Sequence, residues 1–135
     1  MKLWVVEIHH PKGFFMNKLK TKCSTTENIE FFICEFRKAF GDEELVKNVF
    51  TCGYCYHFAN ILENLFNGEI MYNPIDNHFA FMDLQHHFLW DINGKINNEN
   101  LFTNCWYNWE SYQIEDPIES KRIMEQCAYI LCPFI

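Results

Sequence analysis

Residues in the middle of the chain have the types that nucleophilic catalysis requires. Cys55 lies in the segment TCGYCYHFA, and His78 and Asp91 follow in two strand-like segments. A thiol becomes an effective nucleophile as a thiolate, and an imidazole held by a carboxylate can accept its proton and later return it. We therefore predict that Cys55, His78 and Asp91 form a catalytic triad, in which His78 carries the proton and Asp91 orients the imidazole.

A predicted β-hairpin brings the imidazole and the carboxylate together. In the segments His78–Leu84 and His87–Ile92, the side chains are predicted to point alternately to the two faces of a sheet, and a two-residue loop lies between the segments. In a tight hairpin Ala80 faces Asp91, which makes His78 a same-face diagonal neighbour of Asp91, about 7–8 Å away at the backbone. The opposite face is predicted to be an apolar layer of Phe79, Phe81, Phe88, Trp90 and Ile92.

The candidate nucleophile is predicted to stand at the start of a helix. The helix begins near Tyr54, stops at Gly68, and has an apolar stripe of Phe58, Ile61, Leu62, Leu65 and Phe66. At this position the unpaired N–H groups and the positive end of the helix dipole favour a thiolate at Cys55. The same N–H groups can hold the oxyanion of a tetrahedral intermediate.

The cysteine segment resembles a known nucleophile signature. Cys52-Gly53-Tyr54-Cys55-Tyr56 resembles the papain-family pattern C-G-x-C followed by Trp or Tyr, which makes Cys55 the nucleophile. Asn77-His78-Phe79-Ala80 is similar to the family's histidine strand, and Leu89-Trp90-Asp91 resembles the strand of the third triad member in transglutaminase-like relatives. The resemblance covers roughly residues 50–96. It implies a cysteine hydrolase or acyl transferase that acts on an amide, peptide or isopeptide bond through an acyl-enzyme, without cofactor or metal.

Two features depart from papain. The interval between Cys55 and His78 is far shorter than in papain-type enzymes, which points to a minimal core of the transglutaminase-like or NlpC/P60-like sort. The glutamine that papain relatives place in the oxyanion hole has no clear counterpart, because Asn48 is poorly placed for that role.

Other chemistry for the two cysteines remains open. Cys52 and Cys55 have the Cys-x-x-Cys spacing of a thiol–disulfide redox site, in which one thiolate is activated and the other resolves. The same pair could bind zinc with histidine ligands drawn from His57, His78, His86 and His87.

Simpler roles also remain open for the hairpin and for the aromatic residues that follow it. His78 could merely begin a strand while Asp91 binds the turn at Asn93-Gly94. The aromatic segment Cys105–Trp109, with Tyr112, would suit a non-catalytic binding domain on the same fold, or ordinary core and rim packing.

The composition limits the class of protein and its partners. The chain has 135 residues, of which 49% are hydrophobic and 18% aromatic, and we expect one domain over residues 1–135 with a substantial core. A net charge of −7 and the lack of a basic stripe argue against nucleic acid as the partner. Without a signal-peptide pattern or an apolar stretch of membrane-spanning length, we expect a cytosolic protein whose partner is its acyl or amide substrate.

The remaining pattern completes an α+β fold. The Ser24–Glu27 pair has capping-box spacing and starts a helix that Gly41 ends, while Asp116-Pro117 starts a C-terminal helix that ends before Pro133. The other predicted elements are strands at Leu3–Ile8 and Glu69–Tyr72 and a short helix at Asp42–Val49.

Overall fold

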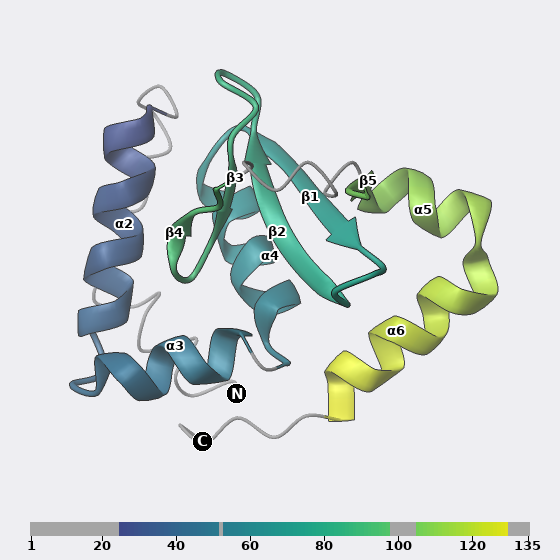
Figure 1. The fold of residues 1–135 in the computed structure, drawn as a ribbon, viewed down its shortest axis with the longest axis horizontal. Helices are drawn as coiled ribbons and strands as arrows, with labels where there is room; N and C mark the ends of the chain where they lie inside the picture. The colour runs from purple at the N-terminus through teal and green to yellow at the C-terminus, as the bar shows by residue number, and fades with distance from the viewer. Residues whose placement is uncertain (1–24, 52, 98–104, 130–135) are drawn as a thin grey trace.

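A computed structural model describes residues 25–51, 53–97 and 105–129 of the protein (Figure 1). Within these ranges it contains five helices and five strands, which confirms the predicted α+β class. The predicted strand Leu3–Ile8 lies outside the described residues. The helices are α2 (Thr26–Lys38), α3 (Glu43–Thr51), α4 (Cys55–Leu65), α5 (Trp109–Glu115) and α6 (Pro117–Tyr129).

The strands form one antiparallel sheet in the order β4-β3-β2-β1-β5. They are β1 (Gly68–Asn73), β2 (His78–Asp83), β3 (Leu89–Asp91), β4 (Gly94–Lys95) and β5 (Tyr107–Asn108). Helix α4 packs on the central strands, with α2 and α3 beyond it at the β4 side and α5 and α6 at the β5 side (Figure 1). The first residues of α4 and of β2 lie toward the same end of the molecule, so the fold brings Cys55 and His78 to one region.

The predicted hairpin register is confirmed. Met82 pairs with Leu89 and Phe81 with Trp90, which places Ala80 opposite Asp91. The strand ends were wrong, because β2 stops at Asp83 and β3 begins only at Leu89. The loop is a wider turn in which the His87 N–H donates to the Asp83 carbonyl oxygen at 2.9 Å, and His87 has a positive φ of 59°.

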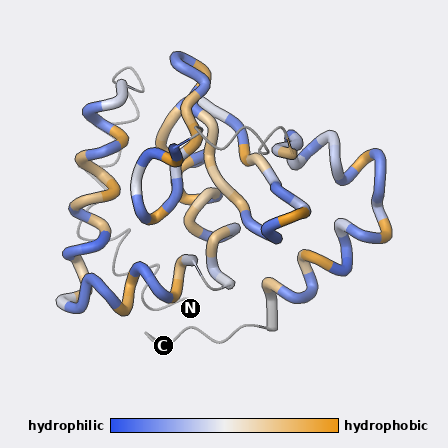
Figure 2. Tube along the Cα trace, in the orientation of Figure 1, coloured by the Kyte–Doolittle hydropathy of each residue, from blue (hydrophilic) through white to orange (hydrophobic). Residues whose placement is uncertain are grey.

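The apolar face of the hairpin forms the core with α2, α3 and α4. Phe79, Phe81, Trp90 and Ile92 are buried, as predicted, whereas Phe88 is only partly buried. Figure 2 shows apolar residues gathered along α4 and β2. The predicted stripe of α2 is buried too, at Ile29, Phe32, Ile33 and Phe36. The largest fully buried side chains include Trp90, Phe32, Phe36, Phe50, Phe58, Phe79 and Phe81. Removing this much apolar surface from water is the main force that holds α4 against the sheet.

Several predicted boundaries need correction. The N-cap of α2 is Thr25, whose hydroxyl accepts from the Asn28 N–H at 3.2 Å, while Ser24 lies outside the described residues. Helix α4 ends at Leu65, and Gly68 does not stop it but begins β1. A Cβ at Gly68 would overlap the Met82 carbonyl oxygen, so close packing against β2 explains this glycine.

The C-terminal region contains both confirmed and unpredicted elements. Helix α6 begins at Pro117 with the Asp116 carboxylate accepting from the Glu119 N–H at 3.1 Å, which confirms the predicted start. Its predicted end, before Pro133, lies outside the described residues. The elements β4, β5 and α5 were not predicted.

We expect Asp83→Ala to destabilise the fold strongly. Asp83 is 1% exposed, and its carboxylate accepts from the Trp90 indole N–H at 2.8 Å and from the His86 backbone N–H at 2.6 Å. Alanine leaves these two donors unpaired, which should lower the free energy of unfolding by about 2–4 kcal/mol. Urea unfolding measures this, and Asp83→Asn, which keeps an acceptor oxygen, should lose less. If Asp83→Ala were as stable as the wild type, the stabilising role of these two hydrogen bonds would be contradicted.

Candidate active site

Cys55 is the first residue of α4, as predicted, and its thiol is free and buried. The preceding Tyr54 is the N-cap, but its side chain does not cap the helix. Tyr54 is itself buried, and its ring lies 6.1 Å from that of Phe50, which anchors the start of the helix on α3. The core therefore holds the thiol at the positive end of the α4 dipole, where a negative charge on sulfur is stabilised.

His78 and Asp91 meet as the hairpin register requires. The Nε2 of His78, at the start of β2, lies 3.0 Å from Oδ2 of Asp91, at the end of β3. Both side chains are mostly shielded, with 18% and 15% of their surface exposed. When Nε2 carries the proton it donates to the carboxylate, which sets the orientation of the ring.

The pKa of His78 links the imidazole to Cys55 as well as to Asp91. Burial by itself lowers the pKa of His78, but the hydrogen bonds to Asp91 and Cys55, with the negative charges of both groups, raise it to about 9. The structure thus pairs His78 with Asp91, and the pKa of His78 indicates that Cys55 lies close enough to interact with the same ring.

Asp91 also accepts a hydrogen bond within the turn that follows it, a role that the sequence also suggested. Its Oδ1 accepts from the backbone N–H of Asn93 at 2.8 Å, in the turn that leads to Gly94. One oxygen of the Asp91 carboxylate therefore binds the turn, and the other binds the imidazole. The turn bond restrains the carboxylate, which helps to hold His78 in place.

We expect Asp91→Asn to lower the pKa of His78. The raised pKa means that the interactions of His78 stabilise the folded protein fully below about pH 6.5, and this stabilisation is lost as the pH rises through about 9. Removing the Asp91 charge should shift the His78 titration toward lower pH. The interactions of His78 would then stabilise the folded protein over a narrower range of pH. NMR titration of the imidazole measures the shift. Asp76→Asn, in the exposed turn before β2, is the matched control and should leave it unchanged. An unshifted titration in Asp91→Asn would contradict the pairing.

Two neighbours of the site were not identified as such from the sequence. The ring of Trp106 lies 6.1 Å from the His78 ring in an edge-on arrangement. Cys127, near the end of α6, belongs to the same buried cluster as Cys55. Burial, and then the charge of Cys55, raise the pKa of Cys127 to about 11, which makes it a poor thiolate beside the candidate nucleophile.

Three further histidines, His57, His86 and His87, lie in the described part of the chain. His86 and His87 are exposed in the hairpin loop. His57 is half-buried, and burial lowers its pKa, which a hydrogen bond with the Cys127 backbone only partly offsets. Within the described residues no group of three metal-ligating side chains could hold a metal ion, and Cys52 lies outside those residues.

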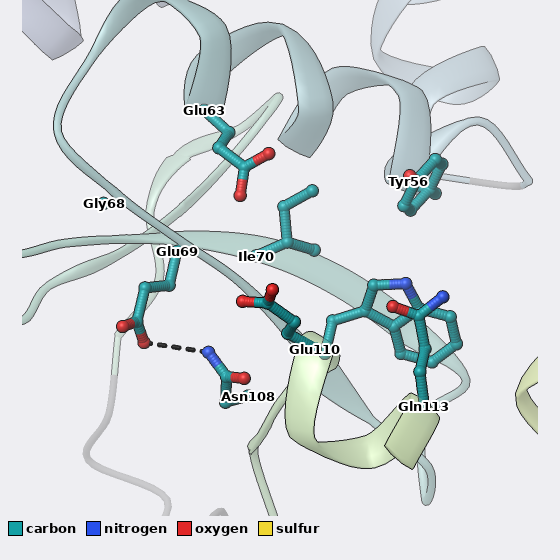
Figure 3. A pocket seen from close by; sticks show the side chains of 9 residues that line it. Tyr56, Glu63, Gly68, Glu69, Ile70, Asn108, Glu110 and Gln113 are labelled. Atoms are coloured by element: carbon teal, nitrogen blue, oxygen red, sulfur yellow. Dashed lines mark hydrogen bonds between the residues drawn. The ribbon is translucent and has the colours of Figure 1, made fainter. Parts of the chain in front are cut away.

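A pocket of about 340 Å³ lies between α4, β1 and the start of α5 (Figure 3). Tyr56, which directly follows the candidate nucleophile, and Trp109 form walls, and three glutamates line the space. Burial, and next the charge of Glu110, raise the pKa of Glu63, with a smaller contribution from Glu69. Carboxylates that share one space disfavour a further negative charge there. The pocket therefore suits a neutral or cationic part of a ligand.

No protein-family model, curated protein or solved structure matches this chain. In the described part of the chain, no helix has both the length and the apolar character that crossing a membrane requires. The geometry around Cys55, His78 and Asp91 is therefore the basis on which a function can be inferred.

Proposed function

We propose that this protein is a cysteine-dependent hydrolase or acyl transferase that acts on an amide, peptide or isopeptide bond. Cys55 is the nucleophile, His78 the proton carrier and Asp91 the residue that orients His78. The single observation that supports this most is the pairing of His78 with Asp91, in which Nε2 lies 3.0 Å from the carboxylate. The raised pKa of His78 indicates that Cys55 interacts with the same ring. A helix-borne thiol, a strand-borne imidazole and a carboxylate on the next strand also suit a minimal papain-like or transglutaminase-like core.

The first half of the reaction forms an acyl-enzyme. With a pKa raised to about 9, His78 holds a proton at neutral pH and faces Cys55 as an imidazolium. The Cys55 sulfur attacks the carbonyl carbon of the substrate, and the electron pair of the carbonyl moves onto oxygen. When this tetrahedral intermediate collapses, His78 gives its proton to the leaving amine and the carbon–nitrogen bond breaks.

The second half returns the enzyme to its starting state. Water, or an acceptor amine, then attacks the thioester. As it does so, the now neutral imidazole of His78 takes a proton from the attacking molecule. Collapse of this second intermediate releases the acyl group and leaves Cys55 and His78 as an ion pair again. Water yields hydrolysis and an amine yields transfer, and both use the same three residues.

Trapping the acyl-enzyme tests this proposal without knowledge of the natural substrate. p-Nitrophenyl acetate acylates reactive thiols and releases a coloured product. We expect a burst of p-nitrophenolate equal to the amount of protein, with the acetyl group located on Cys55 by peptide mass spectrometry. Acetylation spread over several cysteines at equal, slow rates would refute a dedicated nucleophile.

A further inference from the structure

The pocket beside α4 adjoins the candidate nucleophile. Tyr56, which directly follows Cys55, forms one wall, and Trp109 forms another. Ile70 and Trp109 belong to the same buried cluster as Cys55, and Tyr56 packs against that cluster. The volume of about 340 Å³ lies within the range of sites that bind small molecules, about 300–1,000 Å³. A substrate attached to the thiol can therefore extend a side chain into this pocket.

The aromatic walls of the pocket are fixed in place by the core. Trp109 is 4% exposed, and its ring packs edge-on against Phe79 with 4.8 Å between the ring centroids. The ring of Tyr56 packs against the same phenylalanine at 5.1 Å. Two rings that rest on one buried residue form a rigid apolar surface. The aliphatic part of a ligand can pack on this surface without reorganising the protein.

The other end of the pocket is acidic. Glu63 comes from α4, Glu69 from β1 and Glu110 from α5. Figure 3 shows the side chains of Glu63 and Glu110 directed toward the same space. The nine residues that line the pocket include no lysine or arginine, and the ion pairs that lysine and arginine form within the described residues involve other glutamates. The described part of the chain therefore supplies no counter-ion to these three carboxylates.

The surroundings of Glu63 show the effect of this accumulated charge. Burial, and next the charge of Glu110, raise the pKa of Glu63. The side-chain amide of Asn108 donates to Glu69 at 3.0 Å, which holds that carboxylate in place without neutralising it. A cation between the carboxylates would relieve their repulsion and accept charge-assisted hydrogen bonds to more than one of them. Charge complementarity therefore selects a basic group as the occupant.

We propose that this pocket binds the basic side chain of a lysine or arginine in the substrate, and this inference rests on the proposed function. The aliphatic stem packs on Tyr56 and Trp109, as the stems of long basic side chains do on apolar surfaces. The ammonium or guanidinium group lies between Glu63 and Glu110. Glu63 is eight residues after Cys55 on α4, which is about 12 Å along the helix axis. One residue of extended chain, about 3.5 Å, together with a long side chain spans this separation, so the basic residue precedes the acyl residue.

Two activated esters that differ only at the end of one side chain test this specificity. The p-nitrophenyl esters of Nα-acetyl-lysyl-glycine and Nα-acetyl-norleucyl-glycine acylate the same thiol, and norleucine has the aliphatic stem of lysine without the ammonium group. We expect the lysyl ester to acylate Cys55 about 10-fold faster at limiting concentration, which corresponds to about 1.4 kcal/mol. A hydrogen bond to a charged partner has an effect of this size.

A pair of glutamine substitutions removes the charge and keeps the size of both side chains. In Glu63→Gln combined with Glu110→Gln, the ratio of the lysyl rate to the norleucyl rate should fall about 10-fold, to near equality. Because the ratio compares two esters on the same protein, any effect on the thiol itself cancels. Glu115→Gln combined with Glu125→Gln is the matched control, since both glutamates are exposed and lie outside the pocket. It makes the same change in net charge and should keep the wild-type ratio.

Binding of the side chain alone is measured without the reaction. Nα-Acetyl-lysine methylamide is titrated into isotope-labelled protein and followed by NMR. We expect the backbone resonances of Glu63 and Glu110 to shift with the lysine derivative and to stay unchanged with Nα-acetyl-norleucine methylamide.

The outcomes distinguish this inference from the function on which it rests. Equal rates for the two esters in the wild type, or a ratio that persists without the Glu63 and Glu110 charges, overturn the basic-side-chain site and leave the triad intact. An equal fall of the ratio in the control shows an effect of net charge alone, which also overturns the site. If wild-type Cys55 reacts slowly with both esters while the lysine derivative still shifts the two resonances, the proposed function fails and the pocket remains a site for a basic side chain.

Discussion

Replacing Cys55 by alanine should abolish the p-nitrophenolate burst. Cys55 supplies the only sulfur to which the proposed acyl group is attached, so the rate should fall at least about 1000-fold, to the background of scattered side-chain acylation. The side chain is 7% exposed, and alanine could loosen its surroundings. Cys55→Ser, which keeps nearly the same shape, should lose the burst as well, and thermal unfolding of both variants checks that they remain folded.

Two other cysteines provide the controls for this result. Cys127→Ala removes a buried thiol from the same cluster and should keep the burst. Cys52→Ala should also retain most of the activity, because the proposed reaction needs one thiol. A loss in Cys52→Ala equal to that in Cys55→Ala would instead support a dithiol redox site or a zinc site.

His78→Ala should have the second-largest effect, on the reactivity of Cys55 itself. Interaction with Cys55 contributes to the raised pKa of His78, so the imidazole carries a proton near neutral pH. A positive charge close to a thiol favours the thiolate. Without it, the rate of Cys55 alkylation by iodoacetamide near neutral pH should fall about 100-fold, a typical loss for a positioned acid–base group. Peptide mass spectrometry of the labelled protein measures the rate at each cysteine.

The exposed histidine of the hairpin loop is the matched control for His78. His86 is on the same hairpin, and His86→Ala should leave the alkylation rate of Cys55 unchanged. Equal rates for wild type and His78→Ala would mean that the imidazole does not activate the thiol. The His78–Asp91 pair would then only hold the two strands together.

The hairpin shows how far the sequence can predict the site. A shift of one residue would move Phe79, Phe81 and Trp90 from the core to the other face, so their alternation specifies the register. The same register places His78 near Asp91. The position of Cys55 followed in the same way from the apolar stripe of α4.

The Trp106 environment could not be predicted, because it depends on contacts between distant segments. Strand β5 has only two residues, and its pairing with β1 joins parts of the chain far apart in sequence. The short helix α5 lacks a long apolar stripe, although Asn108 caps it by accepting from the Ser111 N–H at 2.9 Å. Local patterns indicate such caps only weakly when the element is a few residues long.

Labelling of each cysteine by iodoacetamide across a range of pH tests the central claim most directly. We predict that Cys55 alone reacts rapidly well below about pH 8, where an ordinary thiol is mostly protonated, and that His78→Ala removes this reactivity. The zinc content of the same sample is measured alongside. The claim would be contradicted if Cys52 and Cys55 lost reactivity together on oxidation, or if Cys55 became reactive only after treatment with a chelator.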